Sequence, residues 1–473
     1  MVKRCLVAVG SLALLSAASA ITQTIAQNST GHDVSRDATV SRVFADQTSA
    51  VSVSPQLPVI PPRKFVITDF GAVGDGKTLN TEAFRKTIAA CREAAGGEVI
   101  VPAGVFVTAP ITLASHMAFV IGKGATVRGS GDFRDYEKAA VESAPKAPRT
   151  SVLPLIGGAN LTDVEIRGEG AIDGAGESWW KRFRAERVAG VPQQGQPRAP
   201  GQPAETPRPK LVWLADCTRV HIQGVSLRNS PQFHLVPQRC RDVLIENVSI
   251  IAPSDSPNTD AIDPTGSSNV LIRRCFIDVG DDHVSFKSNP NDAPTENILV
   301  SDCTFKHGHG ASVGSNVGGG IRNITVERCT FEGSDNGIRI KSARDRGGVV
   351  ENIIYRDITM KNVGVAITIN LFYFDKEGQK ERVTKPVTPT TPIVRGVRVM
   401  NVSVDEAGTA GEIVGLPEMP VSEVLLDNVT IKSKTGMIVK DARSVEFRGV
   451  HIVPQKGEPL TIAHADVKTT NRD

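Results

Sequence analysis

Aromatic residues are scarce in this chain of 473 residues, which contains only three Trp and three Tyr. A protein that binds polysaccharide without cleaving it needs exposed rings on which sugars stack. Charge of one sign is also lacking, since the formal net charge is +3 and Lys3 and Arg4 supply two of these charges. The sequence therefore argues against a purely polysaccharide-binding role, and it predicts no polybasic surface for nucleic acid.

A long apolar run is missing as well. No stretch of about 18 apolar residues occurs, so no membrane span is predicted. The first 20 residues instead have the organisation of a secretory signal, with Lys3 and Arg4 before a mostly apolar segment and Ala18-Ser19-Ala20 at the expected cleavage site. The protein is therefore predicted to be exported, either to the periplasm or out of the cell. Residues 21–60 are rich in Ser, Thr, Gln, Val and Pro and are predicted to be a flexible leader.

Residues 61–460 are predicted to form one domain of stacked coils, followed by a tail over residues 461–473. Eight short strands share the pattern seen in Asn247-Val-Ser-Ile and Arg328-Cys-Thr-Phe, at steps of 23, 27, 28, 26, 29, 44 and 27 residues. A repeat of this length is typical of one coil of a solenoid. Asn tolerates a left-handed backbone and can hydrogen-bond between coils, so a ladder of Asn is expected at one turn. Its members stand six residues before four of the strands: Asn269, Asn297, Asn323 and Asn352.

Three segments depart from the repeat. A helix is expected over residues 81–95, with Asn80 as its N-cap, and it would cap the amino-terminal end of the solenoid. No further helix is predicted after Glu98. Two excursions, over residues 177–209 and 371–392, are expected to emerge on one face and to flank the binding surface.

The cysteines add little chemistry. Cys275, Cys303 and Cys329 replace Val or Ile at one strand position, which predicts that they stack in the core. Cys217 and Cys240 occupy equivalent positions on neighbouring coils, and the sequence leaves open whether they form a disulfide. No Cys-x-x-Cys pair or His cluster suggests zinc, and we expect no metal and no cofactor.

Four polar clusters between residues 258 and 341 are the most informative feature of the chain. They are Asn258-Thr259-Asp260, Gly280-Asp281-Asp282, Gly308-His309-Gly310 and Arg339-Ile340-Lys341. The seven-residue segments that contain them begin 22, 27 and 27 positions apart, which is the spacing of the coils. The clusters are therefore expected on consecutive coils, within roughly 10–15 Å of one another.

Alternation along the strands separates inward from outward side chains. The apolar members are expected to face the core: Ile262, Val284, Phe286, Ala311, Val313, Ile338 and Ile340. The residues between them are expected to point outward: Asp263, Ser285, Lys287, Ser312, Arg339 and Lys341. Gly308, Gly310 and Gly314 are expected to leave room for a ligand above the sheet. The roles of Asp263, Lys287, His283 and Asn316 stay open.

Carboxylates and cations in this arrangement suit the cleavage of an acidic polysaccharide. Hydrolysis of a glycosidic bond needs one carboxylic acid to protonate the leaving oxygen and one carboxylate to activate water. Crowded like charges raise at least one pKa, which keeps an acid protonated near working pH. Arg339 and Lys341 are suited to bind a sugar carboxylate.

The four clusters, in this order and spacing, resemble the signatures of the polygalacturonases of glycoside hydrolase family 28. The resemblance covers about residues 63–455, including Asp69-Phe-Gly-Ala-Val-Gly-Asp-Gly76 near the start. It implies an all-β fold, a single-stranded right-handed parallel β-helix, and hydrolysis of α-1,4-linked galacturonic acid in pectin with inversion. The partner is then a polysaccharide, and the enzyme is expected to be a monomer.

The resemblance also assigns roles by position. Asp281 matches the general acid, Asp260 and Asp282 match the pair that holds and activates water, and His309 matches the residue that supports the acid. Arg339 and Lys341 match the residues that bind a galacturonate carboxylate. Asn258 would orient its neighbours. Inversion implies roughly 6.5–9.5 Å between the acid and base carboxyls.

Several alternatives remain. Rhamnogalacturonan or xylogalacturonan hydrolysis would use the same fold, although retention of both His309 and Lys341 argues against the former. A calcium-dependent pectate lyase would need a carboxylate cage and an arginine base, and the three Asp could mimic such a cage. His283, which follows Asp282 where many family members have Cys or a small residue, would either shift the pH optimum or lie outward in solvent.

Overall fold

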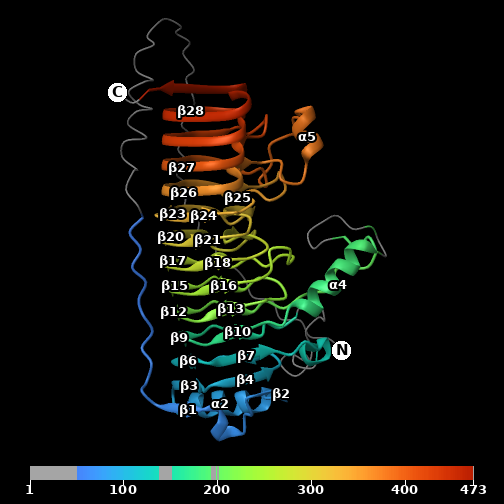
Figure 1. Ribbon diagram of the computed structural model, residues 1–473, viewed down its shortest axis with the longest axis vertical. Coiled ribbons are helices and arrows are strands. Elements are labelled where there is room, and N and C mark those ends of the chain that lie inside the picture. The colour runs from blue at the N-terminus through green and yellow to red at the C-terminus, as the bar shows by residue number, and fades with distance from the viewer. Residues whose placement is uncertain (1–50, 138–151, 193–198, 200–201, 472–473) are drawn as a thin grey trace, which may run out of the picture. The chain divides into compact units, whose positions relative to one another are not determined.

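The computed structural model describes residues 51–137, 152–192, 199 and 202–471, all within a unit that spans Ser49–Asp473. The predicted secretory signal and most of the predicted leader lie outside the described residues. Every pairing between named strands is parallel, and each strand pairs with its equivalents on the coils before and after it. The fold is therefore a right-handed parallel β-helix, as the repeat and the resemblance predicted (Figure 1).

The strands stack in three columns that form the three sides of the coil. The first column contains β1 (Lys64–Val66), β3 (Gly97–Val101), β6 (Met117–Ile121), β9 (Thr162–Gly168), β12 (Thr218–Gln223), β15 (Arg241–Glu246), β17 (Ser268–Arg273), β20 (Thr295–Ser301) and β23 (Ile321–Glu327). The second contains β2 (Asp75–Leu79), β4 (Gly104–Thr108), β7 (Ala125–Gly129), β10 (Ala171–Asp173), β13 (Ser226–Arg228), β16 (Ser249–Ile251), β18 (Phe276–Asp278), β21 (Thr304–Phe305) and β24 (Thr330–Glu332). The third contains β5 (Ile111–Thr112), β8 (Ile156–Ala159), β11 (Val212–Ala215), β14 (Leu235–Gln238), β19 (Val284–Ser288), β22 (Ala311–Val317) and β25 (Asn336–Lys341).

The last coils are formed by continuous strands that run through all three columns. They are β26 (Val349–Asn370), β27 (Ile393–Val414) and β28 (Val421–Thr470). The predicted tail over residues 461–473 therefore begins inside a strand. The backbone N–H of Ser444 donates to the Asp466 carboxylate at 2.9 Å, which holds the end of β28 against the coil before it.

The apolar interior and the Asn ladder confirm the predicted register. Asn269, Asn297, Asn323 and Asn352 all have φ between 53° and 56°. In the ladder, the Asn323 amide donates to Asn297 Oδ1 and the Asn352 amide donates to Asn323 Oδ1, each at 2.9 Å. The side-chain amides thus pair coil to coil at a turn that requires a left-handed backbone.

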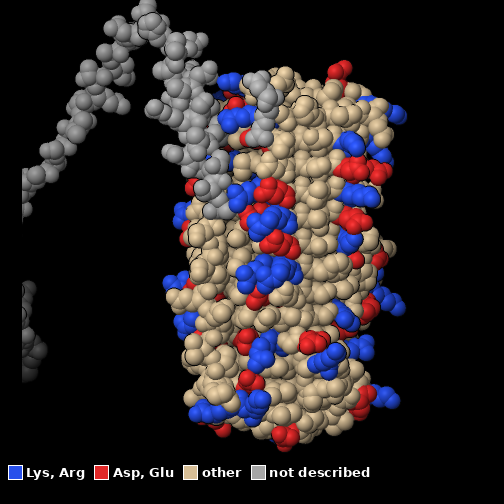
Figure 2. All heavy atoms as spheres, turned by 60° about the vertical axis from the view of Figure 1, so that its left-hand side comes forward, with Lys and Arg blue, Asp and Glu red and all other residues tan. Residues whose placement is uncertain are grey.

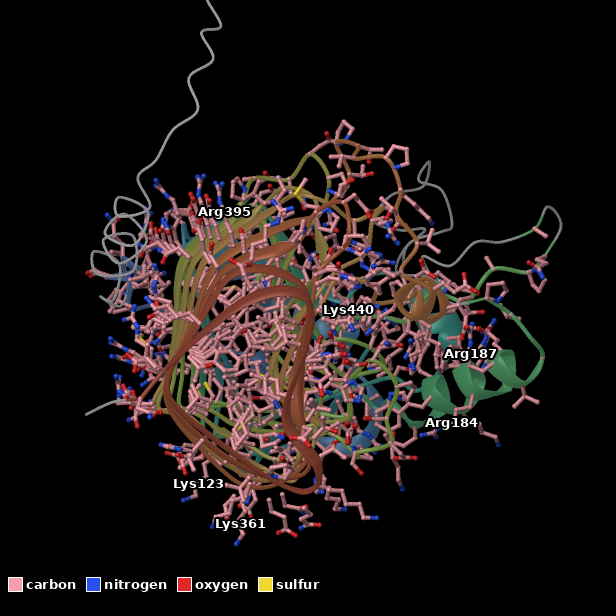
Figure 3. All side chains as sticks on the ribbon, turned by 90° about the horizontal axis from the view of Figure 1, so that it is seen from above. Lys123, Arg184, Arg187, Lys361, Arg395 and Lys440 are labelled. Atoms are coloured by element: carbon pink, nitrogen blue, oxygen red, sulfur yellow. The ribbon has the colours of Figure 1, made fainter. Side chains whose placement is uncertain are left out.

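The helices partly contradict the expectations. Helix α2 (Thr81–Glu93) packs against β1, β3 and the short 3₁₀ helix η1 (Ile67–Phe70). Asn80 is its N-cap residue, as predicted, but the Asn80 side chain makes no capping hydrogen bond. Its side chain instead bonds to the backbone of Val73, with Oδ1 2.6 Å from the Val73 nitrogen. The prediction that no helix follows Glu98 was wrong, because both excursions contain one: α4 (Glu177–Val188) and α5 (Lys376–Glu381). Both helices project from the same side of the coils, as expected for the excursions (Figures 1 and 3).

The end of the predicted leader is bound rather than free. Residues 51–60 have no regular secondary structure and follow the side of the coils opposite α4 and α5 (Figure 1). The backbone N–H of Ser54 donates to Asn269 at 3.2 Å, and that of Val59 donates to Asp163 at 3.1 Å. Side-chain oxygens at the turn that carries the Asn ladder therefore tie down this segment.

Alternating charges cover the face away from the excursions (Figure 2). Glu296, Arg322, Glu351 and Arg395 are successive partners in register on the first column, and their ion pairs measure 2.6 and 2.7 Å. The charges on this face therefore neutralise one another, which leaves the face with the excursions as the candidate binding surface.

The described cysteines behave as apolar core residues. Cys275, Cys303 and Cys329 are buried, as predicted, and Cys217 and Cys240 are buried free thiols with no disulfide between them. Within the described part of the chain, no helix is long and apolar enough to cross a membrane.

Candidate active site

The predicted clusters lie together on the outer face of the third column. Ser285 is in register with Ser312, and Ser312 is in register with Arg339, on β19, β22 and β25. The seven residues predicted to face inward are all fully buried. Lys341 continues in register to Asn370, Val414 and Lys440, and Lys440 marks this face beside α5 in Figure 3.

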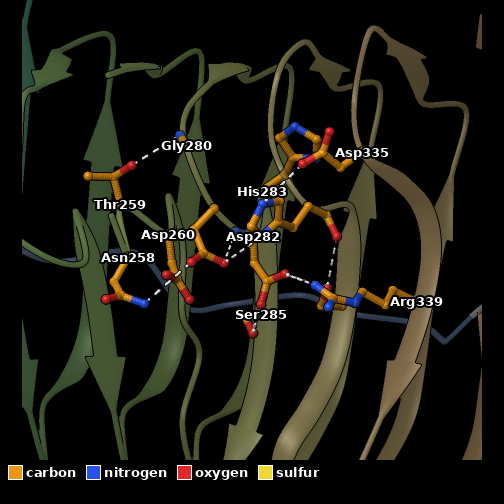
Figure 4. Close-up of polar contacts among 12 residues, drawn as sticks. Asn258, Thr259, Asp260, Gly280, Asp282, His283, Ser285, Asp335 and Arg339 are labelled. Atoms are coloured by element: carbon orange, nitrogen blue, oxygen red, sulfur yellow. Dashed lines mark hydrogen bonds and ion pairs between the residues drawn. The ribbon is translucent and has the colours of Figure 1, made fainter. Parts of the chain in front are cut away.

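Hydrogen bonds tie the first two clusters to each other. The Gly280 N–H donates to Thr259 Oγ1 at 3.0 Å, which links the turn before Asp260 to the turn before Asp281 (Figure 4). Asn258, with φ +54°, directs its side-chain amide to Asp281 Oδ2 at 3.4 Å. The Asn258 amide is therefore in contact with the Asp281 carboxylate.

Asp282 is the most completely bonded carboxylate of the site. Its Oδ1 accepts from Ser312 at 2.7 Å and from Arg339 at 3.3 Å, and its Oδ2 accepts from Ser285 at 3.0 Å and Lys341 at 2.7 Å. Burial opposes ionisation of Asp282, but the charges of Lys341 and Arg339 outweigh it and hold its pKa far below the usual range. Asp282 is therefore an anion that fixes both cations.

Asp281 lies beside the imidazole of His309. His309 Nδ1 is 3.0 Å from Asp281 Oδ1, and its Nε2 is 3.3 Å from Asp335 Oδ2. Burial raises the pKa of Asp281, yet the His309 hydrogen bond and neighbouring cations lower it on balance. Burial lowers the pKa of His309, but the hydrogen bond to Asp281 and the negative charge of Asp281 outweigh it, so the pKa is raised on balance. The sequence did not predict the contact of Asp335 with His309, because this contact depends on the path of the turn in the next coil.

Asp260 forms a separate ion cluster with Lys287 and Asp263. The Lys287 ammonium is 2.8 Å from Asp260 Oδ2 and 2.7 Å from Asp263 Oδ2, and it lies 4.2 Å from the centroid of the Phe233 ring. Burial raises the pKa of Asp260 well above its ordinary value, with Lys287 opposing, and raises that of Asp263 to about 6. The expected raised pKa thus belongs to Asp260 and not to Asp281.

The structure shows where the residues lie whose roles the sequence left open. Asp263 and Lys287 join the site, whereas Asn316 bonds to Asn289 and Arg346 away from the carboxylates. His283 is fully buried and stacks on Phe305 at 4.9 Å, so the prediction that it could lie outward in solvent was wrong. Strand β19 begins at Val284, and the preceding turn therefore directs His283 inward.

The glycines of the site serve the fold rather than a ligand. A Cβ at Gly308 would lie 2.5 Å from His283 Nε2, and a Cβ at Gly314 would lie 2.1 Å from the Lys341 carbonyl oxygen. Gly310 has φ +94° and similarly close backbone neighbours on the next coil. The predicted room above the sheet is therefore taken up by neighbouring coils.

Both excursions contribute residues that sequence reasoning missed. Tyr373, from the second excursion, places its ring 5.5 Å from the Arg339 guanidinium and 5.2 Å from the Lys341 ammonium. Arg208, from the first, is buried and donates to Asn258 Oδ1 at 2.7 Å and to the carbonyls of Pro231 and Pro257 at 3.1 and 2.8 Å. Their signal in the sequence was only their position in the excursions.

Asp281, Asp282 and His309 also offer ligand atoms within 4.8 Å of one another, which is close enough for a metal. Asp282 already has the ammonium of Lys341 and the guanidinium of Arg339 on its two oxygens. A third cation there would be repelled by both, so the residues do not fit a metal.

The chain is similar to known proteins in sequence and in structure. The sequence profile of the Glycosyl hydrolases family 28 matches residues 91–447. A probable polygalacturonase of Vitis vinifera is 31% identical over 77% of this chain and 73% of its own length, and an endo-polygalacturonase of Pectobacterium parmentieri is 31% identical over 68% and 79%. The crystal structure of an exopolygalacturonase from Thermotoga maritima matches with a TM-score of 0.72 at 27% identity, over 89% of this chain and 97% of that one.

Proposed function

The chain belongs to family 28 of the glycosyl hydrolases, and from that premise we propose that it hydrolyses α-1,4-linked galacturonic acid in polygalacturonate with inversion. The observation that carries the proposal is the contact of Asp282 with both Arg339 and Lys341, beside Asp281 and Asp260 on neighbouring coils. This contact puts a site suited to an anionic sugar next to carboxylates suited to acid and base catalysis.

Asp281 is the general acid in this proposal. Among the three carboxylates its side chain is the most exposed, at 18% against 5% for Asp260 and 1% for Asp282, so it is the one that can reach a glycosidic oxygen. In the free enzyme the His309 bond favours its ionised form. A sugar carboxylate on Arg339 and Lys341 would neutralise these cations and exclude water, and both effects raise the pKa of Asp281 toward that of a proton donor.

Asp260 activates the attacking water. Lys287 occupies its Oδ2, and among the described residues no side chain is bonded to Oδ1, which leaves that oxygen for a water. The charge of Lys287 opposes the effect of burial on the pKa of Asp260 and so favours the ionised form that a base needs. Asp282 holds the water from the other side and fixes the cations, and Tyr373 covers the bound carboxylate.

Three further parts of the proposal concern where and how the enzyme works. The secretory signal over residues 1–20 supports export. The enzyme is further proposed to act as a monomer. The relatives include both endo- and exo-acting enzymes, and the second excursion lies next to Arg339 and Lys341, where it would limit the length of the chain bound beyond the cleaved bond.

Reducing-sugar release from polygalacturonate tests the proposal, with the parent compared to Asp281→Asn. We expect the parent to release sugar and the variant to be at least about 100-fold slower, because it lacks an acid. Equal rates would show that Asp281 is not the acid. Release of an unsaturated product, abolished by a chelator, would instead establish a lyase.

A further inference from the structure

Lys210 is a half-buried lysine in an unusual setting. It stands two residues before the start of β11, and its backbone carbonyl accepts from the Leu155 N–H at 3.0 Å. Its ammonium lies 5.2 Å from the centroid of the Trp213 ring, and no carboxylate of the described chain lies within ion-pair distance of it. Burial lowers the pKa of Lys210, with the charge of Asp263 opposing. A desolvated cation without an anion is costly, and a bound anion would relieve that cost.

The two lysines of the catalytic clusters, in contrast, are paired with carboxylates. Lys287 contacts two carboxylates, and Lys341 contacts Asp282. Lys210 thus differs from Lys287 and Lys341, because its ammonium lies near an aromatic ring but contacts no carboxylate. All three lysines lie on the face where an acidic polymer is proposed to bind.

Trp213 lies on the same line of outward residues as the catalytic face. It is in register with Val236, and the bridge between Leu235 and Ile262 brings Asp263 to the next position. Ser285 follows on the coil after that, so Trp213 lies about three coil spacings, roughly 14 Å, from Ser285. Arg339 lies two coils beyond Ser285 in the opposite direction.

The indole is fixed in place and partly exposed. Its Nε1–H donates to Gln238 Oε1 at 2.9 Å, which sets the plane of the ring. The neighbour in register on the preceding coil is Gly157, and the ring of Pro154 packs over Gly157. The ring remains half-buried rather than enclosed.

We propose that Lys210 and Trp213 form a remote subsite for a uronate residue of the bound polysaccharide, on the opposite side of the cleaved bond from Arg339 and Lys341. Lys210 binds the sugar carboxylate, and the indole packs against the sugar ring. The inference rests on the proposed function and adds to it a second contact with a sugar carboxylate. Only substrate chains long enough to extend from Arg339 and Lys341 to Lys210 would reach this contact.

Kinetics on galacturonate oligomers of increasing length test the subsite. Lys210→Met should raise KM about 10-fold for polygalacturonate while leaving kcat unchanged, because it removes one charge-assisted contact far from the reacting bond. The shortest oligomers that the parent cleaves should show no change. Lys210→Arg should restore the KM of the parent. Lys361→Met, at an exposed position of the second column that lies away from α4 (Figure 3), is the matched control and should behave as the parent.

The outcomes separate the subsite from the activity. If the parent cleaves polygalacturonate and Lys210→Met shows the same length dependence, or the same loss on every length, the subsite is wrong. If Lys210→Arg does not retain the KM of the parent, the charge is not what binds. A parent that cleaves no galacturonate polymer would overturn the proposed function itself.

Discussion

Replacing Lys287 by Met should disable Asp260 while leaving the rest of the site in place. The ammonium lies 2.8 and 2.7 Å from two carboxylates in a site where the three side chains are 17%, 5% and 1% exposed. Removing one partner from a buried ion pair costs about 3–5 kcal/mol, and each 1.36 kcal/mol corresponds to about one pKa unit. The pKa of Asp260 should therefore rise further, because the charge that opposes the effect of burial is gone.

The assay is the pH profile of reducing-sugar release together with urea unfolding. The limb of the profile in which activity rises with pH should move to higher pH, because Asp260 must lose its proton to act as a base. The folded pKa of both carboxylates then lies above the unfolded value of about 4, so their ionisation destabilises the fold. The loss of unfolding free energy should accordingly grow as the pH rises from about 4 and reach about 3–5 kcal/mol.

Two further variants make the reasoning refutable. Lys306→Met removes an ion pair with Glu332 at a surface where the two side chains are 32% and 58% exposed, and it should cost less than about 1 kcal/mol. Asp263→Asn in the Lys287→Met background removes the repulsion and should recover part of both effects. An unmoved pH profile, with a loss no larger than that of Lys306→Met, would show that Lys287 does not control Asp260.

Other contacts predict smaller or separable effects. Tyr373→Ala should raise KM more than it lowers kcat, since the ring covers the two cations; the reverse pattern would place Tyr373 in the chemical step. Arg208→Met should cost about 2–4 kcal/mol of unfolding free energy and lower kcat, because it frees Asn258 and leaves two carbonyls unpaired; unchanged urea midpoints would contradict this. The buried, neutral His283 has its pKa lowered by burial to about 4, so the unfolded chain takes up its proton first and stability should fall as the pH drops from about 6.5 to about 4. In His283→Leu this part of the pH dependence should disappear.

Much of the architecture could be predicted because a stacked coil repeats its constraints. The Asn at each turn needs both a left-handed backbone and a partner on the next coil, so the spacing of Asn297 and Asn323 is enough to predict the register of their coils. The alternation of Ile338, Arg339, Ile340 and Lys341 then separates core from surface. These predictions depend on the coil repeat, and they are confirmed where the sequence follows that repeat.

The predictions failed where the chain leaves the period. His283 belongs to a turn, so strand alternation did not apply to it, and its ring fills the space beside Gly308. Tyr373 and Arg208 come from excursions that no repeat describes. Helix α4 has an irregular apolar pattern in which Trp179 and Trp180 are adjacent, and both are buried. Lys287 was expected to point outward. Its pairing with Asp260 was not predicted, because it depends on distances between coils that the spacing of residues in the sequence does not determine.

The stereochemistry of the first product tests the central claim most directly. Proton NMR of polygalacturonate or its oligomers, recorded during the first turnovers, reports the anomeric configuration of the new reducing end before it mutarotates. If Asp281 donates the proton while Asp260 activates water from the opposite face, the new end must appear in the β configuration. An α-configured first product would contradict the account, because it would require a covalent intermediate on one of these carboxylates.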